Sequence, residues 1–354
     1  MIENPENIKQ HYIIGIGRSG TSLLSSILNS HSEILATPEV LFIVFFYHTF
    51  FRKKKFTAEE IDLLIEYIEL YSVKHPYAGW NFNKEKLKSI LKARNCQITF
   101  SDLCKLAHLS FETKGKNSER IKLIIDKNPI NTLFAEKLMK LSNESKFILM
   151  VRDYRANILS RKQNPHLRGT NTYIHAIRWN FFNGKAKMLL QKYPENIFLL
   201  KYEDLAANPE NSVKSVCKFL NIDFNPEMLN FYKLEQEKYS IPQIIKNETE
   251  KTRIHRGIKK YGDLTKPVNT SRIEAWKKEL SFNDISIAEQ ICGKTGEFFG
   301  YQKFKKISLL KKSSIFFLGI PKLVLIKSER IRDIILFYIS PFTKIIRVRQ
   351  MYRS

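Results

Sequence analysis

The sequence predicts an α/β fold of three layers, in which helices cover both faces of a central parallel sheet. Short apolar segments, typical of strands buried on both faces, alternate with longer segments that have helical periodicity. A glycine-rich turn follows the first of these strands, and polar clusters follow two others. Parallel sheets bind ligands beyond the carboxyl ends of their strands. We therefore expect one α/β domain with a site at one edge of its sheet.

Four strands are expected, at residues 12–14, 122–125, 147–151 and 197–200. The expected helices repeat apolar residues every three or four positions and cover residues 57–71, 133–141, 173–191, 212–220, 271–280 and 283–299. Asn208 and Pro209 suit the start of the helix at 212–220, because asparagine caps helix N-termini and proline fits the first helical position. These elements end near residue 301, so we expect a domain at 1–301 and an extension at 302–354.

The chain is strongly basic, with a formal net charge of +24 over 354 residues. The extension holds 13 Lys and Arg residues against two acidic ones, and it alternates them with apolar residues. That composition is typical of segments that lie on anionic membranes. A basic domain also suits anionic ligands, although no nucleic-acid-binding motif is present. The four cysteines form no C-x-x-C pair, so we expect no metal site.

The first polar cluster is the turn at residues 15–22, with sequence GIGRSGTS. A glycine-rich turn that leads into a helix can surround a phosphate with backbone N–H groups, and the helix dipole favours the negative charge. Gly15 and Gly20 have the spacing of a nucleoside-triphosphate P-loop, but Thr21 stands where that loop has its lysine. The cation is Arg18 instead. The turn therefore predicts a P-loop-like fold and a phosphate-like ligand other than the γ-phosphate of ATP.

Two further clusters follow the second and third strands. Arg152 comes directly after the strand at 147–151, and Ser160 lies in the helix that follows. A guanidinium fork and a hydroxyl at this spacing can hold one phosphate together. Asp126, Lys127 and Asn128 follow the strand at 122–125. With the glycine-rich turn, these groups predict a shared anion site.

The clusters together resemble the sulfotransferases that use 3′-phosphoadenosine 5′-phosphosulfate (PAPS) as donor. Further similar segments are 201–205 (KYEDL), 208–210 (NPE), 217–222 (CKFLNI), 266–269 (KPVN), Trp276 and 299–301 (FGY). The resemblance covers about residues 10–301 and favours the bacterial branch that is related to the tyrosylprotein sulfotransferases. It implies the α/β fold deduced above.

The resemblance also implies roles for individual residues. Ser19, Gly20, Thr21 and Ser22 correspond to the loop that binds the 5′-phosphosulfate, and Arg152 and Ser160 to the pair that binds the 3′-phosphate. Tyr202 corresponds to a contact on the adenosine side, and Lys266 to a late phosphate contact. Arg18 and Lys127 correspond to cations that stabilise the transition state. Asn164 stands where the tyrosylprotein enzymes have a further arginine, with Arg161 nearby.

Glu39 corresponds to the catalytic carboxylate of that branch, which removes the proton of the acceptor. It precedes the apolar run at 40–46, whose burial would raise the pKa of the Glu39 carboxyl. Two alternatives remain. Glu39 could be an acid that caps the following helix, and His48 could be the base. A single histidine on an apolar run is expected to pack in the core instead.

The sequence therefore predicts an enzyme that transfers a sulfuryl group from PAPS to a hydroxyl, without a metal ion. The expected acceptor is a sugar, a glycolipid or a small metabolite, with a tyrosyl group less favoured. The first ten residues do not resemble a secretion signal, so we expect a cytoplasmic protein, peripheral on a membrane if the extension binds lipid. Two copies of the chain could also associate as a homodimer. The alternatives are a P-loop kinase or NTPase, and a non-catalytic protein that binds anionic membranes or nucleic acid.

Overall fold

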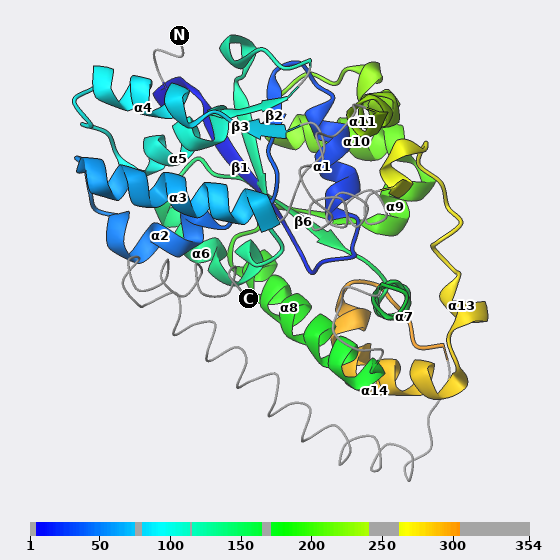
Figure 1. The fold of residues 1–354 in the computed structure, drawn as a ribbon. Helices are drawn as coiled ribbons and strands as arrows, with labels where there is room; N and C mark the ends of the chain where they lie inside the picture. Colours follow the sequence, from blue (N-terminus) through cyan, green and yellow to red (C-terminus); the bar gives the residue numbers. More distant parts are fainter. Residues whose placement is uncertain (1–4, 75–79, 114, 165–170, 241–261, 305–354) are drawn as a thin grey trace.

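The structure, a computed structural model, describes residues 5–74, 80–113, 115–164, 171–240 and 262–304 (Figure 1). Its centre is a parallel sheet of five strands in the order β2-β5-β1-β6-β7. The strands are β1 (Lys9–Ile14), β2 (Ile34–Ala36), β5 (Leu123–Lys127), β6 (Phe147–Val151) and β7 (Ile197–Lys201). The predicted parallel sheet is confirmed, and all four expected strands belong to it. β2 was not expected, because it is only three residues long.

Helices cover both faces of the sheet, as predicted (Figure 1). One apolar core joins the sheet to α2 (Phe42–Phe50), α3 (Ala58–Lys74), α4 (Lys84–Ala93), α5 (Phe100–Leu109), α6 (Asn131–Leu141), α7 (Tyr154–Lys162), α8 (Thr172–Lys192) and α14 (Phe282–Phe298). The other core joins it to α1 (Thr21–Asn29), α9 (Tyr202–Ala207), α10 (Pro209–Leu220) and α11 (Phe231–Ser240).

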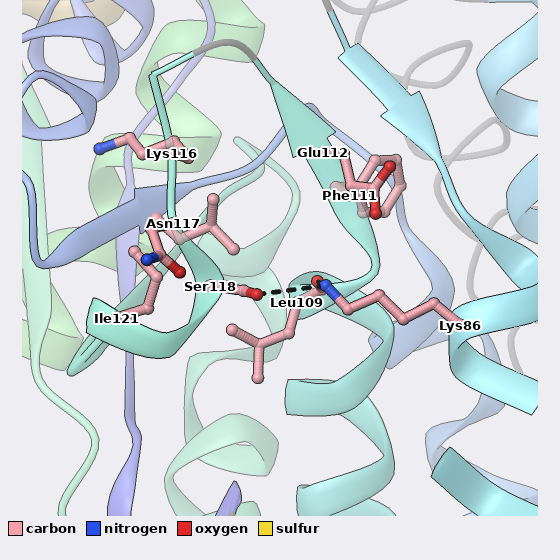
Figure 2. Close-up of a pocket in the computed structure, with 9 residues that line it drawn as sticks. Lys86, Leu109, Phe111, Glu112, Lys116, Asn117, Ser118 and Ile121 are labelled. Carbon is pink, nitrogen blue, oxygen red and sulfur yellow. Dashed lines mark hydrogen bonds between the residues drawn. The ribbon is translucent and has the colours of Figure 1, made fainter. Parts of the chain in front are cut away.

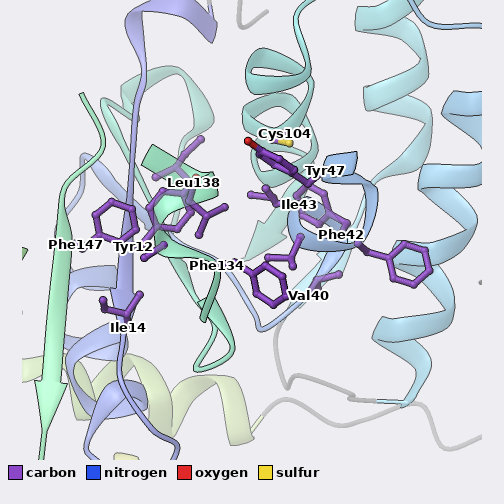
Figure 3. Packing of buried hydrophobic residues seen from close by; sticks show 14 of the residues in the cluster. Tyr12, Ile14, Val40, Phe42, Ile43, Tyr47, Cys104, Phe134, Leu138 and Phe147 are labelled. Carbon is purple, nitrogen blue, oxygen red and sulfur yellow. The ribbon is translucent and has the colours of Figure 1, made fainter. Parts of the chain in front are cut away.

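Alternation along β1 explains how the sheet supports both cores. Tyr12 and Ile14 belong to the first core, whereas Ile13 belongs to the second. The Tyr12 ring stacks on Phe147 of β6, with 5.0 Å between the ring centroids. Figure 3 shows these side chains facing Phe134 of α6 and the apolar residues of α2. The sheet is thus buried on both faces, and its strand ends are rigid supports for polar side chains.

The helix expected at 271–280 is much shorter in the structure. Only α13 (Trp276–Glu279) is helical. The backbone N–H and the hydroxyl of Ser271 both donate to Asn269 Oδ1, at 3.2 and 2.5 Å. Such local bonds compete with the hydrogen bonds of a helix. Residues 262–275 therefore form an irregular segment with a short 3₁₀ turn at Gly262–Thr265.

The other expected helices are present, with small changes at their ends. α10 begins at Pro209 as predicted, with Asn208 at the N-cap position, but the Asn208 side chain makes no capping hydrogen bond. The strands β3 (Trp80–Phe82) and β4 (Phe111–Thr113) pair antiparallel outside the main sheet. The extension predicted at 302–354 lies outside the described residues beyond Phe304. None of the described helices is both long enough and apolar enough to cross a bilayer.

Candidate active site

A cleft of about 590 Å³ lies at the carboxyl end of the sheet, between the glycine-rich turn, α7 and the segment 263–272. Of the residues for which the sequence predicts a role in binding or catalysis, those that line it are Arg18, Gly20, Thr21, Ser22, Arg152, Ser160, Tyr202 and Lys266. The central strands β5, β1 and β6 are neighbours, so the three expected polar clusters converge at one edge of the sheet. The sequence predicted this convergence only from the general rule that parallel sheets bind ligands beyond the carboxyl ends of their strands.

Backbone conformations that favour glycine shape the turn between β1 and α1. Gly15 has φ +131° and Gly20 has φ +90°. A Cβ atom at Gly15 would lie 2.3 Å from the carbonyl oxygen of Met150, so the turn can follow β6 closely only with glycine there. Arg18 has φ +72°, which is uncommon for a residue with a side chain. This geometry directs the N-terminus of α1 toward the cleft.

The two arginines of the cleft are held by the protein itself. Arg18 Nε donates to Ser160 Oγ at 3.1 Å, which joins the turn to α7. Arg152 donates to the carbonyl oxygens of Arg18 and Arg272, at 3.2 and 2.9 Å. Its guanidinium also stacks on the Tyr202 ring, 4.1 Å from the centroid. Both guanidinium groups are therefore fixed in position at the wall of the cleft.

The Arg152 guanidinium is buried, and its hydrogen bonding is incomplete. Its side chain is 6% exposed, and its Nε–H group has no hydrogen-bond partner. Among the described residues no carboxylate forms an ion pair with it. Burial lowers the pKa of Arg152 from its usual range; Tyr202 and Glu203 oppose this change, and Arg18 and Arg272 add to it. A buried guanidinium without an ion-pair partner is a candidate site for an anionic ligand.

Glu39 and Lys127 form an ion pair beside the cleft. Lys127 Nζ donates to Glu39 Oε1 and, at 3.2 Å, to the hydroxyl of Ser22, which lines the cleft. The Glu39 side chain is 22% exposed and that of Lys127 is 6% exposed. The contact holds the Glu39 carboxylate next to a cation at the edge of the cleft.

The structure bears on both alternatives to Glu39 as the base. α2 has Leu41 at its N-cap and no acid in its first turn, so Glu39 does not cap this helix. His48 lies in the last turn of α2, where it is exposed and contacts Lys137 Nζ of α6 at 2.7 Å. The expectation that His48 packs in the core is wrong, because α2 buries its other faces and leaves this one toward solvent.

Polar side chains of α7 form hydrogen bonds with the glycine-rich turn. Asn157 Nδ2 donates to the Gly17 carbonyl and to Ser19 Oγ, at 3.2 and 3.1 Å. Arg161 donates to the same carbonyl at 3.3 Å. The Ser19 side chain is buried and does not line the cleft. Asn157 and Arg161 thus hold the turn in place, whereas Asn164 lies on the cleft wall.

The sequence did not single out Arg272 and Gln163, which also line the cleft. Arg272 donates to Gln163 Oε1 at 2.6 Å and to Glu279 at 3.0 Å. These contacts connect the irregular segment after Lys266 to α7. Only its position, six residues after Lys266, could have suggested that Arg272 lies at the cleft. This signal is weak, because the segment has no helical or strand periodicity.

A separate pocket of about 320 Å³ lies at the amino end of β5, away from the cleft. Figure 2 shows Lys86 reaching into it toward Ser118 and Leu109. The Lys86 ammonium donates to the Leu109 carbonyl and to Ser118 Oγ, at 3.2 and 3.3 Å. None of the residues that the sequence singled out lines this pocket. In the described part of the chain, no group of His, Cys, Asp and Glu side chains could hold a metal ion.

Two proteins with similar sequences are sulfotransferases by name. A putative protein-tyrosine sulfotransferase of Caenorhabditis briggsae is 24% identical over 227 residues, which cover 63% of this chain and 69% of that protein. The protein-tyrosine sulfotransferase of Drosophila melanogaster is 21% identical over 275 residues, 76% of this chain. This match spans only 47% of the fly protein. Much of the fly protein therefore has no counterpart in the match.

Among solved structures, the fold is similar to the sulfotransferase domain of the Synechococcus PCC 7002 olefin synthase. The TM-score is 0.50 and the identity 19%, over 84% of this chain and 96% of that domain. The model of the sulfotransferase family matches residues 12–226, more than half of the chain. That range includes the turn, Glu39, Lys127, Arg152 and Ser160. The chain belongs to the sulfotransferase family.

Proposed function

We propose that this protein transfers a sulfuryl group from PAPS to a hydroxyl group of an acceptor, with Glu39 as the general base. The observation that carries the proposal is Arg152. Arg152 lines the cleft beside the N-terminus of α1, forms no ion pair with a described carboxylate, and has a buried Nε–H group without a hydrogen-bond partner. Two places for anions in one cleft suit a nucleotide that carries phosphate at both its 3′ and 5′ positions.

The cleft residues fit such a donor in three parts. The backbone of Gly20, Thr21 and Ser22 would hold the 5′-phosphate end, and Arg152 with Ser160 the 3′-phosphate. Tyr202 presents a ring to the same cleft, and Lys266 lies on its other wall. When bound, PAPS supplies an activated sulfuryl group whose transfer leaves adenosine 3′,5′-bisphosphate.

The reaction requires that the acceptor oxygen lose a proton as it bonds to sulfur. The Glu39 carboxylate would take that proton, while the bond from sulfur to the phosphate oxygen breaks. Lys127 and Arg18 would stabilise the negative charge that builds on the sulfonate and the bridging oxygen. As in phosphoryl transfer, the protein contributes mainly positioning and charge stabilisation.

Two classes of acceptor are candidates. Our expectation from the sequence is a hydroxyl of a sugar, glycolipid or small metabolite. The names of the curated relatives favour a tyrosyl hydroxyl instead. Incubation of labelled PAPS with carbohydrate, lipid and peptide fractions would separate these classes by the fraction that takes up label.

Binding of adenosine 3′,5′-bisphosphate tests the donor site. We expect it to raise the melting temperature in the absence of Mg²⁺, and Arg152→Ala to weaken its binding by about tenfold to a hundredfold, since hydrogen bonds to charged groups contribute about 1.5–3 kcal/mol. Arg120→Ala, at an exposed position outside the cleft, is the matched control and should bind normally. Protection by Mg-ATP alone would favour a P-loop kinase and contradict the proposal.

Glu39→Gln tests the base. This change keeps the size of the side chain and removes its ability to accept a proton at neutral pH. Turnover should fall by about a hundredfold or more, as expected for loss of general base catalysis. Calorimetry should show that adenosine 3′,5′-bisphosphate still binds within about twofold. Unchanged turnover would exclude Glu39 as the base.

A further inference from the structure

The loop that carries Glu39 is fixed on both sides of this residue by buried polar contacts. It joins the end of β2 at Ala36 to the start of α2 at Phe42. On one side, Thr37 Oγ1 lies 2.7 Å from His108 Nδ1. On the other side, Asn128 Nδ2 donates to the Val40 carbonyl oxygen at 3.4 Å. All four of these residues are at most 2% exposed.

The two supports come from different parts of the fold. His108 belongs to the last turn of α5, and its ring lies 4.9 Å from that of Phe42 at the start of α2. Burial lowers the pKa of His108 to about 3, so this imidazole is neutral at physiological pH. It can therefore keep one hydrogen bond to Thr37 over the whole range in which the enzyme would work.

Asn128 follows Lys127 directly, at the end of β5. Its amide also donates to Asp126 Oδ1, which fixes the orientation of the side chain. Lys127 contacts the Glu39 carboxylate, and Asn128 contacts the backbone carbonyl of Val40, the residue after Glu39. The same strand end thus supplies both the partner of the carboxylate and a support for its loop.

We propose that His108, through Thr37, and Asn128, through Val40, are positioning residues that hold the Glu39 carboxylate against Lys127 at the cleft. The inference depends on the proposed role of Glu39 as the base. His108 and Asn128 are at most 2% exposed and do not line the cleft, whereas the Glu39 side chain is 22% exposed, so both residues act through the loop and not on a substrate. A displacement of about 1 Å at a reacting group can reduce the rate about a hundredfold.

Thr37→Val and Asn128→Ala test the proposal. Thr37→Val keeps the shape of the side chain and removes the hydroxyl. Each variant should lower kcat by about tenfold to a hundredfold, with KM for the acceptor and binding of adenosine 3′,5′-bisphosphate within about twofold. Thr37→Ser keeps the hydroxyl and should recover most of the rate. Thr295→Val removes a comparable hydroxyl contact, 2.6 Å from Asn180 in the helices α14 and α8, and should leave kcat unchanged.

The Glu39→Gln background separates this inference from the proposed function. If Thr37 acts through the carboxylate, Thr37→Val should cause no further loss from the residual turnover of Glu39→Gln. A further tenfold loss there would overturn the inference and leave the base in place. A similar loss of bisphosphate binding and kcat in Thr37→Val, or full activity of both single variants, would also overturn it. Full turnover of Glu39→Gln alone would remove the base, and this inference with it.

Discussion

Gly15 determines how closely the glycine-rich turn can approach the sheet. Its φ of +131° is unfavourable for other residues, and a Cβ atom would meet the backbone of Met150. Gly17, two residues later, has no such restriction, because its Cβ atom would lie 3.9 Å or more from any neighbour. Of these two glycines, the backbone conformation and close contacts therefore require glycine only at position 15.

Gly15→Ala should lower the free energy of unfolding by about 2–4 kcal/mol, because strain and the backbone contact add to each other. Gly17→Ala is the matched control and should change it by less than about 0.5 kcal/mol. Urea unfolding of both variants measures the difference. Equal stability of the two proteins would show that the turn can move away from β6 at little cost.

At the scale of single elements, the pairing of β2 with β5 explains why the sequence alone could not place Glu39. β2 is parallel to β5, with Ala36 opposite Ile125, so the residues after both strands emerge at one end of the sheet. This brings Glu39 to Lys127. A strand of three residues has too few positions to show a pattern, and the role of Glu39 therefore came only from the resemblance to a family.

Elements with a strong local signal were predicted well. The turn, Arg152 and Ser160 each follow or adjoin a strand whose apolar run is evident, and the structure places all three on the cleft. The wall formed by Arg272 and Gln163 depends on contacts between residues more than one hundred positions apart. No pattern within either segment could reveal such a contact.

β5 also contains a buried carboxyl that makes stability depend on pH. Burial raises the pKa of Asp126 from 3.8 to about 7, against the opposing effect of the hydrogen bond from Asn128. Between these values the folded protein retains a proton that the unfolded chain releases. The contribution of Asp126 to stability is therefore complete below pH 3.8 and is lost as the pH rises to about 7.

Asp126→Asn cannot titrate and retains an oxygen that accepts from Asn128. Its stability relative to the unmodified protein should therefore increase from pH 4 to pH 7, by up to about 4 kcal/mol, and then stay constant. Urea unfolding at pH 4.5, 6 and 7.5 measures the trend. Asp204→Asn, at an exposed site, is the control. A stability difference independent of pH would contradict the assignment.

At the scale of the whole molecule, the charge is unevenly distributed between the family domain and the residues beyond it. The described chain ends at Phe304, whose ring packs against Trp276 at 5.4 Å and whose N–H donates to Glu289. Trp276 also stacks on Arg155 of α7, the helix whose Ser160 lines the cleft. The residues after Phe304 carry most of the excess of basic residues noted for 302–354.

We propose that this basic extension binds anionic membranes while the domain binds its donor independently. Exchange of Lys305, Lys306, Lys311 and Lys312 for Gln in the full chain should weaken binding to vesicles rich in phosphatidylserine by about a hundredfold or more. Each lysine near such a surface contributes about 1 kcal/mol. Exchange of the exposed Lys214, Lys218, Lys277 and Lys278 removes the same charge elsewhere and serves as the control. Vesicle sedimentation measures the binding. An equal loss in both variants would mean that net charge alone, and not the extension, attracts the protein to the membrane.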